Sequence, residues 1–394
     1  MAPLAVSAYT LVTALGAGRA VTLQALQAGA SGLRRRSFET AMLDTWLGVV
    51  DAADAPCLAP ELAAFDCRNN RLAELGLRAD GFGDAVRAAA ARHGAARVGV
   101  FLGTSTSGIL STEVAYRQRN PASGALPPWL DYAHTHDTYS LAGYVRAALG
   151  LAGPAQVVST ACSSGAKVFA TAQRMLAAGI VDAGVVGGVD SLCMTTLYGF
   201  RALELVSPEI CRPWDAARRG LSLGEGAGFV LLERDAGGAA LRLLGCGESS
   251  DGHHMSAPHP EGAGAAAAMH EALRQAGLEP AQVDYLNLHG TATPNNDSAE
   301  DLAVRSIFGT ALDCSSTKGL TGHTLGAAGG VEAAIALLAI EHGLRPANAN
   351  LVSPDPALHL PVLRAPRLAA VRVAASNSFG FGGSNACLVF GGAR

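Results

Sequence analysis

One cysteine stands where a strand is expected to stop and a helix to begin. In the stretch VVSTACSSGAK (157–167), β-branched residues precede Cys162, and small residues lead from it into an apolar run. At a helix N-terminus, free backbone N–H groups and the helix dipole stabilise a thiolate and lower the pKa of a thiol. The pattern favours a nucleophilic cysteine, and a buried structural cysteine is the alternative.

Two later stretches supply the histidines that a thiol nucleophile needs. His289 follows an expected strand in YLNLHGTATPNND, and His323 shares the glycine-rich loop SSTKGLTGHTLGAAGG with Lys318. Glu332 lies in the helix expected after that loop. Histidines at strand ends among small residues can exchange protons with a substrate, although a lone histidine of this kind is more often structural. Two such loops together with the cysteine favour a catalytic site.

A fourth stretch, NSFGFGGSNACLVF (377–390), is rich in glycine around Phe379 and Phe381. Such a pattern indicates a backbone that bends sharply or closely approaches another group. A hairpin turn between buried strands is one explanation. The other is a loop that offers a backbone N–H to an oxyanion and moves an aromatic ring as a gate.

The elements that must position these residues alternate between strand-like runs and alanine-rich helical segments, as in an α/β protein with buried sheets. A strand, a small-residue loop and an apolar helix occur at 155–178 and again at 313–342. We therefore expect two halves, 1–238 with the cysteine and 239–394 with the two histidines, joined near 235–240. Strands are expected at 97–104, 155–160, 183–189, 228–233, 239–248, 283–290 and 371–380, and helices at 18–28, 83–92, 166–178, 263–276, 298–307 and 326–342.

The bulk composition excludes several classes of protein. Of the 394 residues, 49% are hydrophobic and 16% charged, and the net charge of −4 gives no electrostatic case for binding nucleic acid or an anionic membrane. The eight cysteines show no CxxC spacing, which is typical of reduced thiols in a cytosolic protein. The N-terminus lacks the basic segment of a signal peptide, and no stretch approaches the roughly 20 apolar residues of a membrane span. We expect a soluble, cytoplasmic protein.

Two polar segments interrupt this pattern. The insertion at about 105–150 is polar and irregular, and we expect it to cover a site or to contact another subunit. The segment DGHHMSAPHPEG (251–262) contains His253, His254 and His259. No carboxylates or cysteines accompany them at ligand spacing, so we expect no metal here and a loop that shapes the site entrance.

Together these stretches resemble the β-ketoacyl-acyl carrier protein synthases, which are decarboxylating condensing enzymes. The resemblance covers nearly the whole chain in order and spacing. It implies an α/β thiolase fold, in which two pseudo-duplicated halves form a five-layered αβαβα sandwich. The similar segments are TACSSG around Cys162, RPWDAARRGLSLGEGAGFVLLE (212–233), HGTATPNND (289–297), STKGLTGHTLGAAGGVE (316–332) and NSFGFGGSNA (377–386).

The resemblance also implies roles for the chemical residues. Cys162 would accept the acyl group, and His289 and His323 would support malonyl decarboxylation and the enolate that follows. Lys318 and Glu332 match the buried ion pair that holds the histidine loop of the family.

Further residues match the parts of the family that hold the substrate. Thr291 and Thr293 match threonines that hydrogen-bond the phosphopantetheine arm. Phe381 matches the gating phenylalanine whose N–H, with that of the nucleophile, forms the oxyanion hole. Thr106 and Ile109, in GTSTSGIL, are expected to shape the acyl pocket.

The implied reaction is the decarboxylative Claisen condensation of malonyl carrier protein with a Cys-bound acyl group, giving 3-oxoacyl carrier protein in fatty acid or polyene/polyketide-type synthesis. It needs no metal or other cofactor, because loss of CO2 drives it. The implied partners are an acyl carrier protein and a second subunit, in a homodimer or a heterodimer with a chain-length-factor-like protein. The segments 105–150 and 251–262 are similar to a subgroup tied to aryl polyene pigment assembly.

The chain departs from the family pattern in two places and leaves alternatives to weigh. Ala292 stands where glycine is usual, and Arg219 where aspartate is common.

A non-catalytic chain-length factor would lack the nucleophile, so Cys162 argues against that class. A coenzyme A-dependent thiolase would use a second, C-terminal cysteine, whereas Cys387 is expected to be buried in a strand. The priming condensing enzymes use a histidine–asparagine pair, which the histidine of GHTLGAAGG argues against.

Overall fold

Among the described residues, eleven strands form one mixed sheet that consists of two halves, and β3 with β4 and β12 with β13 form two separate two-stranded sheets. The computed structural model describes residues 2–234 and 238–392. β1 pairs with β8 along most of its length but with β9 only at Leu4 and Ala5, so the halves are joined near the start of β1. The strand order is β11-β10-β14-β15-β9-β1-β8-β7-β5-β6. These strands are β1 (Leu4–Thr13), β5 (Val98–Gly103), β6 (Ala155–Val158), β7 (Ala183–Asp190), β8 (Gly226–Arg234), β9 (Leu241–Ser250), β10 (Tyr285–Asn287), β11 (Cys314–Ser315), β14 (Val373–Gly380) and β15 (Ser384–Gly392).

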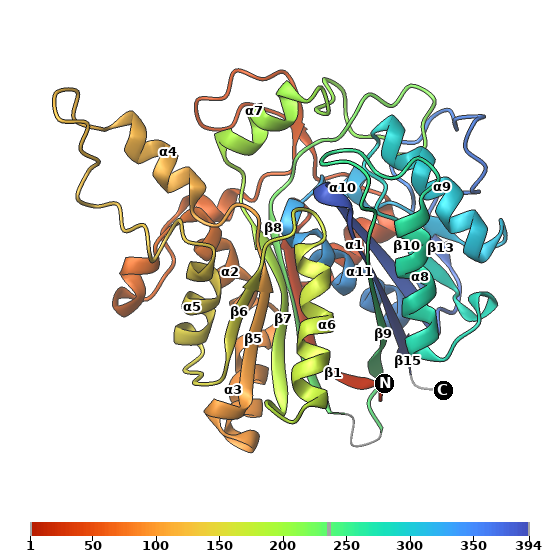
Figure 1. Ribbon diagram of the computed structural model, residues 1–394, viewed down its shortest axis with the longest axis horizontal. Coiled ribbons are helices and arrows are strands. Elements are labelled where there is room, and N and C mark those ends of the chain that lie inside the picture. The colour runs from red at the N-terminus through yellow and green to blue at the C-terminus, as the bar shows by residue number, and fades with distance from the viewer. Residues whose placement is uncertain (1, 235–237, 393–394) are drawn as a thin grey trace.

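Helices cover both outer faces of the sheet halves and fill the space between them (Figure 1). In the centre, α11 packs against α6, against β7 and β8 of one half and against β14 of the other. The outer face of the first half carries α2, α3 and α5, and that of the second carries α8, which packs on α9. The five-layered αβαβα arrangement is therefore confirmed. The helices are α1 (Arg19–Ala28), α2 (Arg68–Arg78), α3 (Phe82–His93), α4 (Ile109–Arg117), α5 (Tyr139–Ala148), α6 (Ser164–Ala177), α7 (Met194–Ala202), α8 (Ala263–Ala276), α9 (Pro294–Phe308), α10 (Lys318–Thr321) and α11 (Ala328–His342).

The apolar pattern of the sequence explains which elements lie inside. β5 and β7 pair in parallel and are buried at every residue, because helices cover both of their faces. α11 is apolar around its whole circumference apart from Glu332 and its last turn, and every residue from Ala328 to Ala339 is buried. The molecule is thus organised around a helix that is buried from Ala328 to Ala339.

Glycines let α6 and α11 approach each other at backbone distance. A Cβ on Gly165 would lie 2.6 Å from the carbonyl oxygen of Gly326, and one on Gly329 would lie 2.2 Å from the amide nitrogen of Ala166. Both distances are too short for any side chain beyond hydrogen. The segment after Cys162 therefore lies directly on the segment after His323.

The expectation that no stretch is apolar enough to span a membrane was wrong for one segment. Leu325–His342 has the length and composition of a membrane-crossing helix, with a mean hydropathy of 1.3. In the fold, 83% of this segment is buried inside the molecule, because it includes the central α11. Its apolar character is accounted for by its place in the core.

The expected strands and helices are all present, with bounds shifted by a few residues. The insertion at 105–150 is not irregular throughout, since it contains α4 and α5. The irregular part is 118–138, which projects beside α4 (Figure 1, upper left). The expected join at 235–240 includes residues 235–237, which lie outside the described residues. The division of the chain at 238 stays a prediction.

The short strands are β2 (Gly16–Ala17), β3 (Arg34–Arg35), β4 (Trp46–Leu47), β12 (Leu344–Arg345) and β13 (Arg367–Leu368).

Candidate active site

Cys162 lies in the sharp turn between β6 and α6. Ala161, just before it, has φ of +51°, a left-handed conformation that L-residues rarely adopt. The Ser164 hydroxyl accepts the N–H of Thr160 at 2.8 Å and donates to the carbonyl of Ala161 at 2.6 Å, which holds the turn. The predicted place of the cysteine between strand and helix is confirmed, and the residue lines a cavity.

His323 lies against the sulfur. Its Nε2 is 3.0 Å from Cys162 Sγ. The backbone of His323 is held on both sides, since its N–H donates to the Ser222 carbonyl at 2.8 Å and its carbonyl accepts the N–H of Gly224 at 2.9 Å. These two backbone hydrogen bonds hold the segment of His323 so that its imidazole lies beside the cysteine turn.

His289 follows β10, and its loop is anchored by a carboxylate that the sequence analysis did not single out. Glu300, on α9, accepts the backbone N–H of His289 at 2.7 Å and of Gly290 at 2.8 Å, and the Asn377 side-chain amide at 3.1 Å. The ring centroids of His289 and His323 are 5.4 Å apart, with the ring planes at 85°. The structure therefore brings together the cysteine and both histidines named from the sequence.

Lys318 and Glu332 form an ion pair beneath the histidines. The Lys318 ammonium donates to Glu332 Oε1 and lies 3.4 Å from His289 Nδ1. Lysine can only donate, so Nδ1 of His289 must accept, and the ring proton of the neutral imidazole then resides on Nε2. Burial raises the pKa of Glu332 to about 7, against the nearby charge of Lys318.

Both histidines are held neutral. Burial, reinforced by the charge of Lys318, lowers the pKa of each imidazole well below its ordinary value, and the neighbouring His323 adds to the effect on His289. At neutral pH each ring therefore carries a single ring proton. A neutral imidazole can donate a hydrogen bond to an oxygen that gains negative charge.

The prediction of a lowered pKa at Cys162 was wrong. Burial raises the pKa of this thiol to about 12, and the positive charge of Lys318 opposes the rise only in part. The desolvation of a buried thiolate outweighs the lowering by Lys318 and by the backbone N–H of Cys162, and the negative charges of Asp190 and Glu332 add to the rise. The thiol is therefore neutral in the free protein, and it needs a base at the moment of reaction.

A cavity of about 310 Å³ connects these groups to the surface. Thr291 and Thr293 both line it, and their hydroxyls lie 2.9 Å apart. The Phe381 ring, in the glycine loop after β14, packs on Phe200 of α7 with centroids 5.5 Å apart. The cavity is lined by Cys162, Phe200, Leu203, Glu204, Leu205, Leu221, Asp251, Ser256, Ala257, Pro258, His289, Thr291, Thr293, Pro294, Asn295, Asn296, His323, Phe379, Gly380, Phe381 and Asn385.

The two residues expected to shape the acyl pocket, Thr106 and Ile109, do not line this cavity. The Thr106 hydroxyl donates to Asp190 at 2.9 Å, and Ile109 packs in a separate apolar cluster with Leu192 and Leu110. Their place in an acyl pocket stays a prediction.

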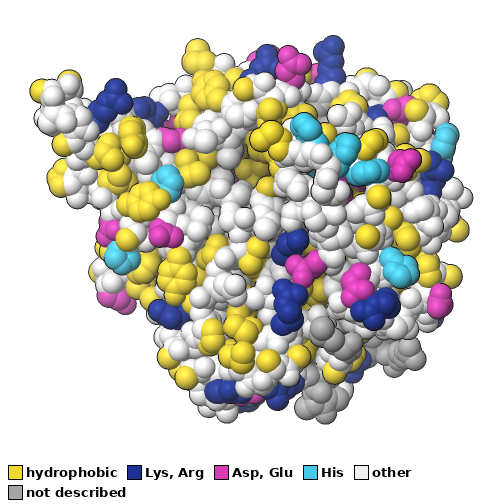
Figure 2. Space-filling model, in the orientation of Figure 1, with side chains coloured by type: hydrophobic (Ala, Val, Ile, Leu, Met, Phe, Trp, Pro, Cys, Tyr) yellow, Lys and Arg dark blue, Asp and Glu magenta, His cyan; other side chains and the backbone are white. Residues whose placement is uncertain are grey.

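The segment 251–262 reaches the mouth of the cavity, as expected, through Asp251 and the residues 256–258. The rings of His253 and His259 are 5.1 Å apart, and Figure 2 shows histidine side chains gathered near the top of this face. Among the described residues, no group of three or more His, Cys, Asp or Glu side chains is arranged to hold a metal ion.

One departure from the family pattern, Ala292, places a residue with a side chain in a strained backbone conformation. Ala292 has φ of +65°, the left-handed region, where an L-residue loses about 1–2 kcal/mol relative to glycine. Its N–H is held by Asp297 at 3.1 Å, and its side chain is buried. The other departure, Arg219, is exposed and does not line the active-site cavity.

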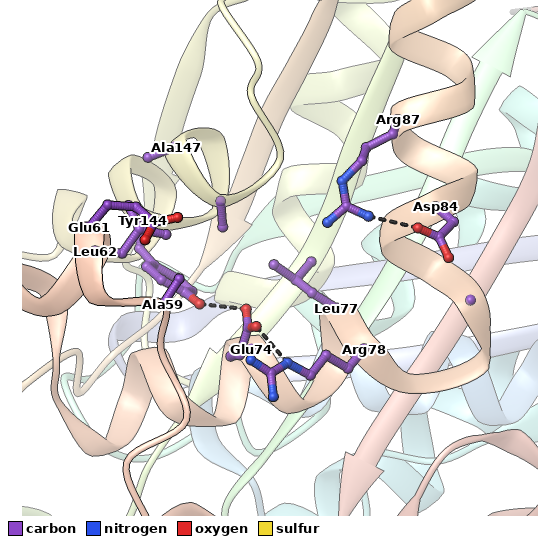
Figure 3. A pocket seen from close by; sticks show the side chains of 12 residues that line it. Ala59, Glu61, Leu62, Glu74, Leu77, Arg78, Asp84, Arg87, Tyr144 and Ala147 are labelled. Carbon is purple, nitrogen blue, oxygen red and sulfur yellow. Dashed lines mark hydrogen bonds and ion pairs between the residues drawn. The ribbon is translucent and has the colours of Figure 1, made fainter.

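A second cavity, of about 460 Å³, lies on the outer face between α2, α3 and α5 and shares no residue with the first (Figure 3). Four of its five charged side chains are paired with one another or with Tyr144. Glu74 accepts from Tyr144 at 2.5 Å and from Arg78 at 2.7 Å, and Arg87 donates to Asp84 at 2.8 Å. The fifth is Glu61.

Comparison with known proteins identifies the family. Residues 81–237 match the N-terminal domain of beta-ketoacyl synthases, and residues 241–352 match the C-terminal domain. The chain is 36% identical to 3-oxoacyl-[acyl-carrier-protein] synthase 2 of Staphylococcus aureus over 75% of this chain and 77% of that protein. It is 42% identical to the mitochondrial 3-oxoacyl-[acyl-carrier-protein] synthase of Arabidopsis thaliana, over 63% of this chain and 58% of that protein.

Solved structures agree. The ketosynthase ApeO in complex with its chain length factor ApeC from Xenorhabdus doucetiae matches with a TM-score of 0.90 and 38% identity, over 100% of this chain and 98% of the other. The ishigamide ketosynthase/chain length factor matches with a TM-score of 0.90 and 27% identity over the full length of both chains. On these similarities, and with the cysteine and both histidines in one cavity, the chain belongs to the beta-ketoacyl synthase family.

Proposed function

We propose that the protein is a 3-oxoacyl-acyl carrier protein synthase. It condenses malonyl carrier protein with an acyl group held on Cys162 and releases CO2. The observation that carries this proposal is the convergence of Cys162, His323 and His289 in one cavity that opens to the surface.

The first step transfers the acyl group to the enzyme. Cys162 attacks the thioester carbonyl, and its proton passes through His323 Nε2, 3.0 Å away, to the departing pantetheine thiolate. The backbone N–H groups of Cys162 and Phe381 stabilise the oxyanion of the tetrahedral intermediate. This proton path suits a thiol whose pKa is raised to about 12 by burial, because no free thiolate has to accumulate.

The second step makes the carbon nucleophile. The malonyl carboxylate leaves as CO2, and its bonding electrons form an enolate whose negative charge falls on the thioester oxygen. The neutral imidazole of His289, which carries its proton on Nε2, donates an N–H hydrogen bond to that oxygen, and His323 does so in the tautomer that carries its proton on Nε2. The enolate carbon then attacks the Cys162 thioester, and the cysteine leaves as a thiolate that takes up a proton.

Other residues hold the substrates and the histidines. Thr291 and Thr293 line the cavity with adjacent hydroxyls, which suits hydrogen bonds to the amides of a phosphopantetheine arm. Lys318, with Glu332, fixes the tautomer of His289. No metal or redox cofactor enters these steps, because decarboxylation itself supplies the driving force.

We also propose that a second thiolase-fold subunit binds beside β6, in a homodimer or with a chain-length-factor-like partner. β6 is the last strand of the sheet order and pairs only with β5, so its other edge is open. The projection formed by α4 and the segment 118–138 exposes Tyr116, Trp129 and Tyr132. Figure 2 shows hydrophobic side chains on this projection at the upper left. Complexes of ketosynthases with chain length factors among the similar structures support this partner.

The alternatives are disfavoured by particular residues. A chain-length-factor-like role leaves the intact cysteine–histidine pair unexplained. A coenzyme A-dependent thiolase needs a second reactive cysteine, but Cys387 is buried in β15 and does not line the cavity. Fatty acid and polyene/polyketide-type synthesis, including aryl polyene assembly, differ in the acyl group and not in this chemistry.

The proposal is tested by intact-mass measurement of the purified protein with saturated, unsaturated and aryl acyl groups on carrier protein, followed by malonyl carrier protein. We expect an acyl adduct on Cys162, then CO2 and a 3-oxoacyl carrier protein. The acyl group that loads fastest identifies the pathway class. Absence of any adduct, alone and with a chain-length-factor partner, overturns the proposal, and loading only from acyl-coenzyme A favours a thiolase.

A further inference from the structure

Asp190 is a fully buried carboxylate outside the cavity, at the end of β7. Because β7 and β5 are parallel neighbours, Asp190 faces the loop that follows β5. Its Oδ1 accepts the hydroxyl of Thr104 at 2.6 Å, the N–H of Ser105 at 2.8 Å, and both the N–H and the hydroxyl of Thr106 at 2.9 Å. One carboxylate oxygen thus holds a whole turn of backbone.

The other oxygen of Asp190 reaches the turn that carries His323. Oδ2 accepts the N–H of Gly326 at 2.6 Å and the Ser105 hydroxyl. Gly326 lies in a single 3-10 turn (Leu325–Ala327) directly after the His323 segment. Leu325 in this turn has φ of +51°, so the backbone is held in a conformation that it would not adopt without support.

The turn has no room to move. A Cβ on Gly326 would lie 2.7 Å from Asp190 Oδ2 and 2.7 Å from the Ser105 nitrogen. On its other side, the Gly326 carbonyl oxygen lies against Gly165 at the start of α6. The turn after His323 is therefore wedged between the carboxylate and the helix that follows Cys162.

Only a carboxyl group satisfies this arrangement. Backbone N–H groups face both oxygens, from Ser105 and Thr106 on one side and Gly326 on the other, and an N–H cannot reverse its polarity. An asparagine would have to point its NH2 group at one of them. The isosteric change would leave the volume unchanged and repel one of the two backbone segments.

We propose that Asp190 is a positioning residue for His323, which holds the imidazole at hydrogen-bonding distance from Cys162 by tying the turn after His323 to the loop after β5. The inference rests on the proposed function for its kinetic consequence but not for its geometry. Asp190 touches no reacting atom. It acts through the backbone of Gly326.

The test compares Asp190→Asn with Asp301→Asn as a matched control. Asp301 is also buried, and one of its oxygens accepts the backbone N–H groups of His359 and Leu360, each at 2.8 Å, away from the cavity. The first measurement is the rate of alkylation of Cys162 by iodoacetamide between pH 6 and pH 9, followed by peptide mass. The second is kcat and KM for CO2 release from malonyl carrier protein, and the third is urea unfolding.

In Asp190→Asn we expect the imidazole to lose its alignment with the sulfur. Alkylation of Cys162 should slow about tenfold at each pH, and kcat should fall about tenfold or more with KM within about threefold. Asp301→Asn should lose stability without either change. An alkylation profile of Asp190→Asn that equals the wild type, or a change that the control reproduces, overturns the proposal.

Two further outcomes are decided in the same experiment. If Asp190→Asn does not fold, Ser105→Ala takes its place, since it removes only the hydroxyl donated to Oδ2; about threefold slower alkylation is expected, and an unchanged rate overturns the proposal. If the wild type releases no CO2, the proposed function fails, and the alkylation comparison still decides the role of Asp190.

Discussion

His323 Nε2 lies 3.0 Å from Cys162 Sγ, although the two residues come from opposite halves of the sequence. The contact depends on the backbone packing of the α6 and α11 segments, where Gly165 meets Gly326 and Gly329 meets Ala166. It places a neutral base beside a neutral thiol, which is the starting state for the proposed acyl transfer.

Cys162→Ala should abolish acyl transfer from carrier protein to enzyme while leaving the fold intact. The substitution removes the only group that can form the thioester, and it removes just one buried sulfur atom from the turn. Intact mass should show no adduct, and circular dichroism and thermal unfolding should stay close to wild type. Elongation activity at the wild-type level in this variant would contradict the proposal.

His323→Ala should retain some acylation and lose malonyl decarboxylation. The thioester exchange can still use the oxyanion hole, whereas the enolate loses one of its two imidazole donors, an effect of about 10²–10³ in rate for a single oxyanion donor. Adduct formation by mass and CO2 release measured on the same preparation separate the two steps. Unchanged CO2 release would remove His323 from this role.

Lys318→Met should destabilise the protein by about 3–5 kcal/mol, because it leaves the Glu332 carboxylate buried without its partner. The double variant Lys318→Met/Glu332→Gln should recover part of that loss, since no charge is then buried. Urea unfolding of the wild type and the two variants measures the difference. A single variant that is more stable than the double one would show that the pair is not electrostatically coupled.

Stability should fall toward acid partly because of His323. Its pKa is depressed in the folded protein, mainly by burial, so below about pH 6.5 the unfolded chain binds a proton that the folded one does not. Stability from this group is full above the unfolded pKa and is lost as the pH falls toward the folded one. His323→Gln should flatten the slope between about pH 6.5 and 5 by up to about 1.4 kcal/mol per pH unit. Parallel pH profiles of the two proteins would contradict this.

Thr293→Val should raise KM for the acyl carrier substrate several-fold with little change in kcat. The substitution keeps the side-chain volume but removes a hydroxyl that faces the cavity beside Thr291. Thr22→Val is a matched control, because that hydroxyl is buried in α1 and donates to the Gly18 carbonyl at 3.0 Å. Equal KM values in the two variants would exclude Thr293 from substrate binding.

Much of the site was visible in the sequence because its residues stand next to clear structural signals. The valines before Cys162 and the apolar run after it mark a strand and a helix, and His289 directly follows a strand. The apolar pattern of 326–342 likewise predicted a helix. These are local patterns, in which the neighbours of a residue along the chain determine its place in the fold.

The remaining parts depend on contacts between distant segments. Asp190 holds the turn after His323 through an N–H 136 residues away, and Glu300 holds the His289 loop from the next helix; nothing beside either residue in the chain marks that role. The pKa of Cys162 depends on how completely the surrounding turn is buried, which the helix N-terminus alone does not reveal.

The glycine contacts between the two central helices bear on how the enzyme could be redesigned. Because main chain meets main chain at Gly165 and Gly329, the spacing of the reactive pair does not depend on the side chains that line the cavity. Leu203, Leu205 and Phe200 are therefore open to exchange for other sizes. Altered acyl preference and preserved chemistry should be separable traits in libraries that leave those two glycines alone.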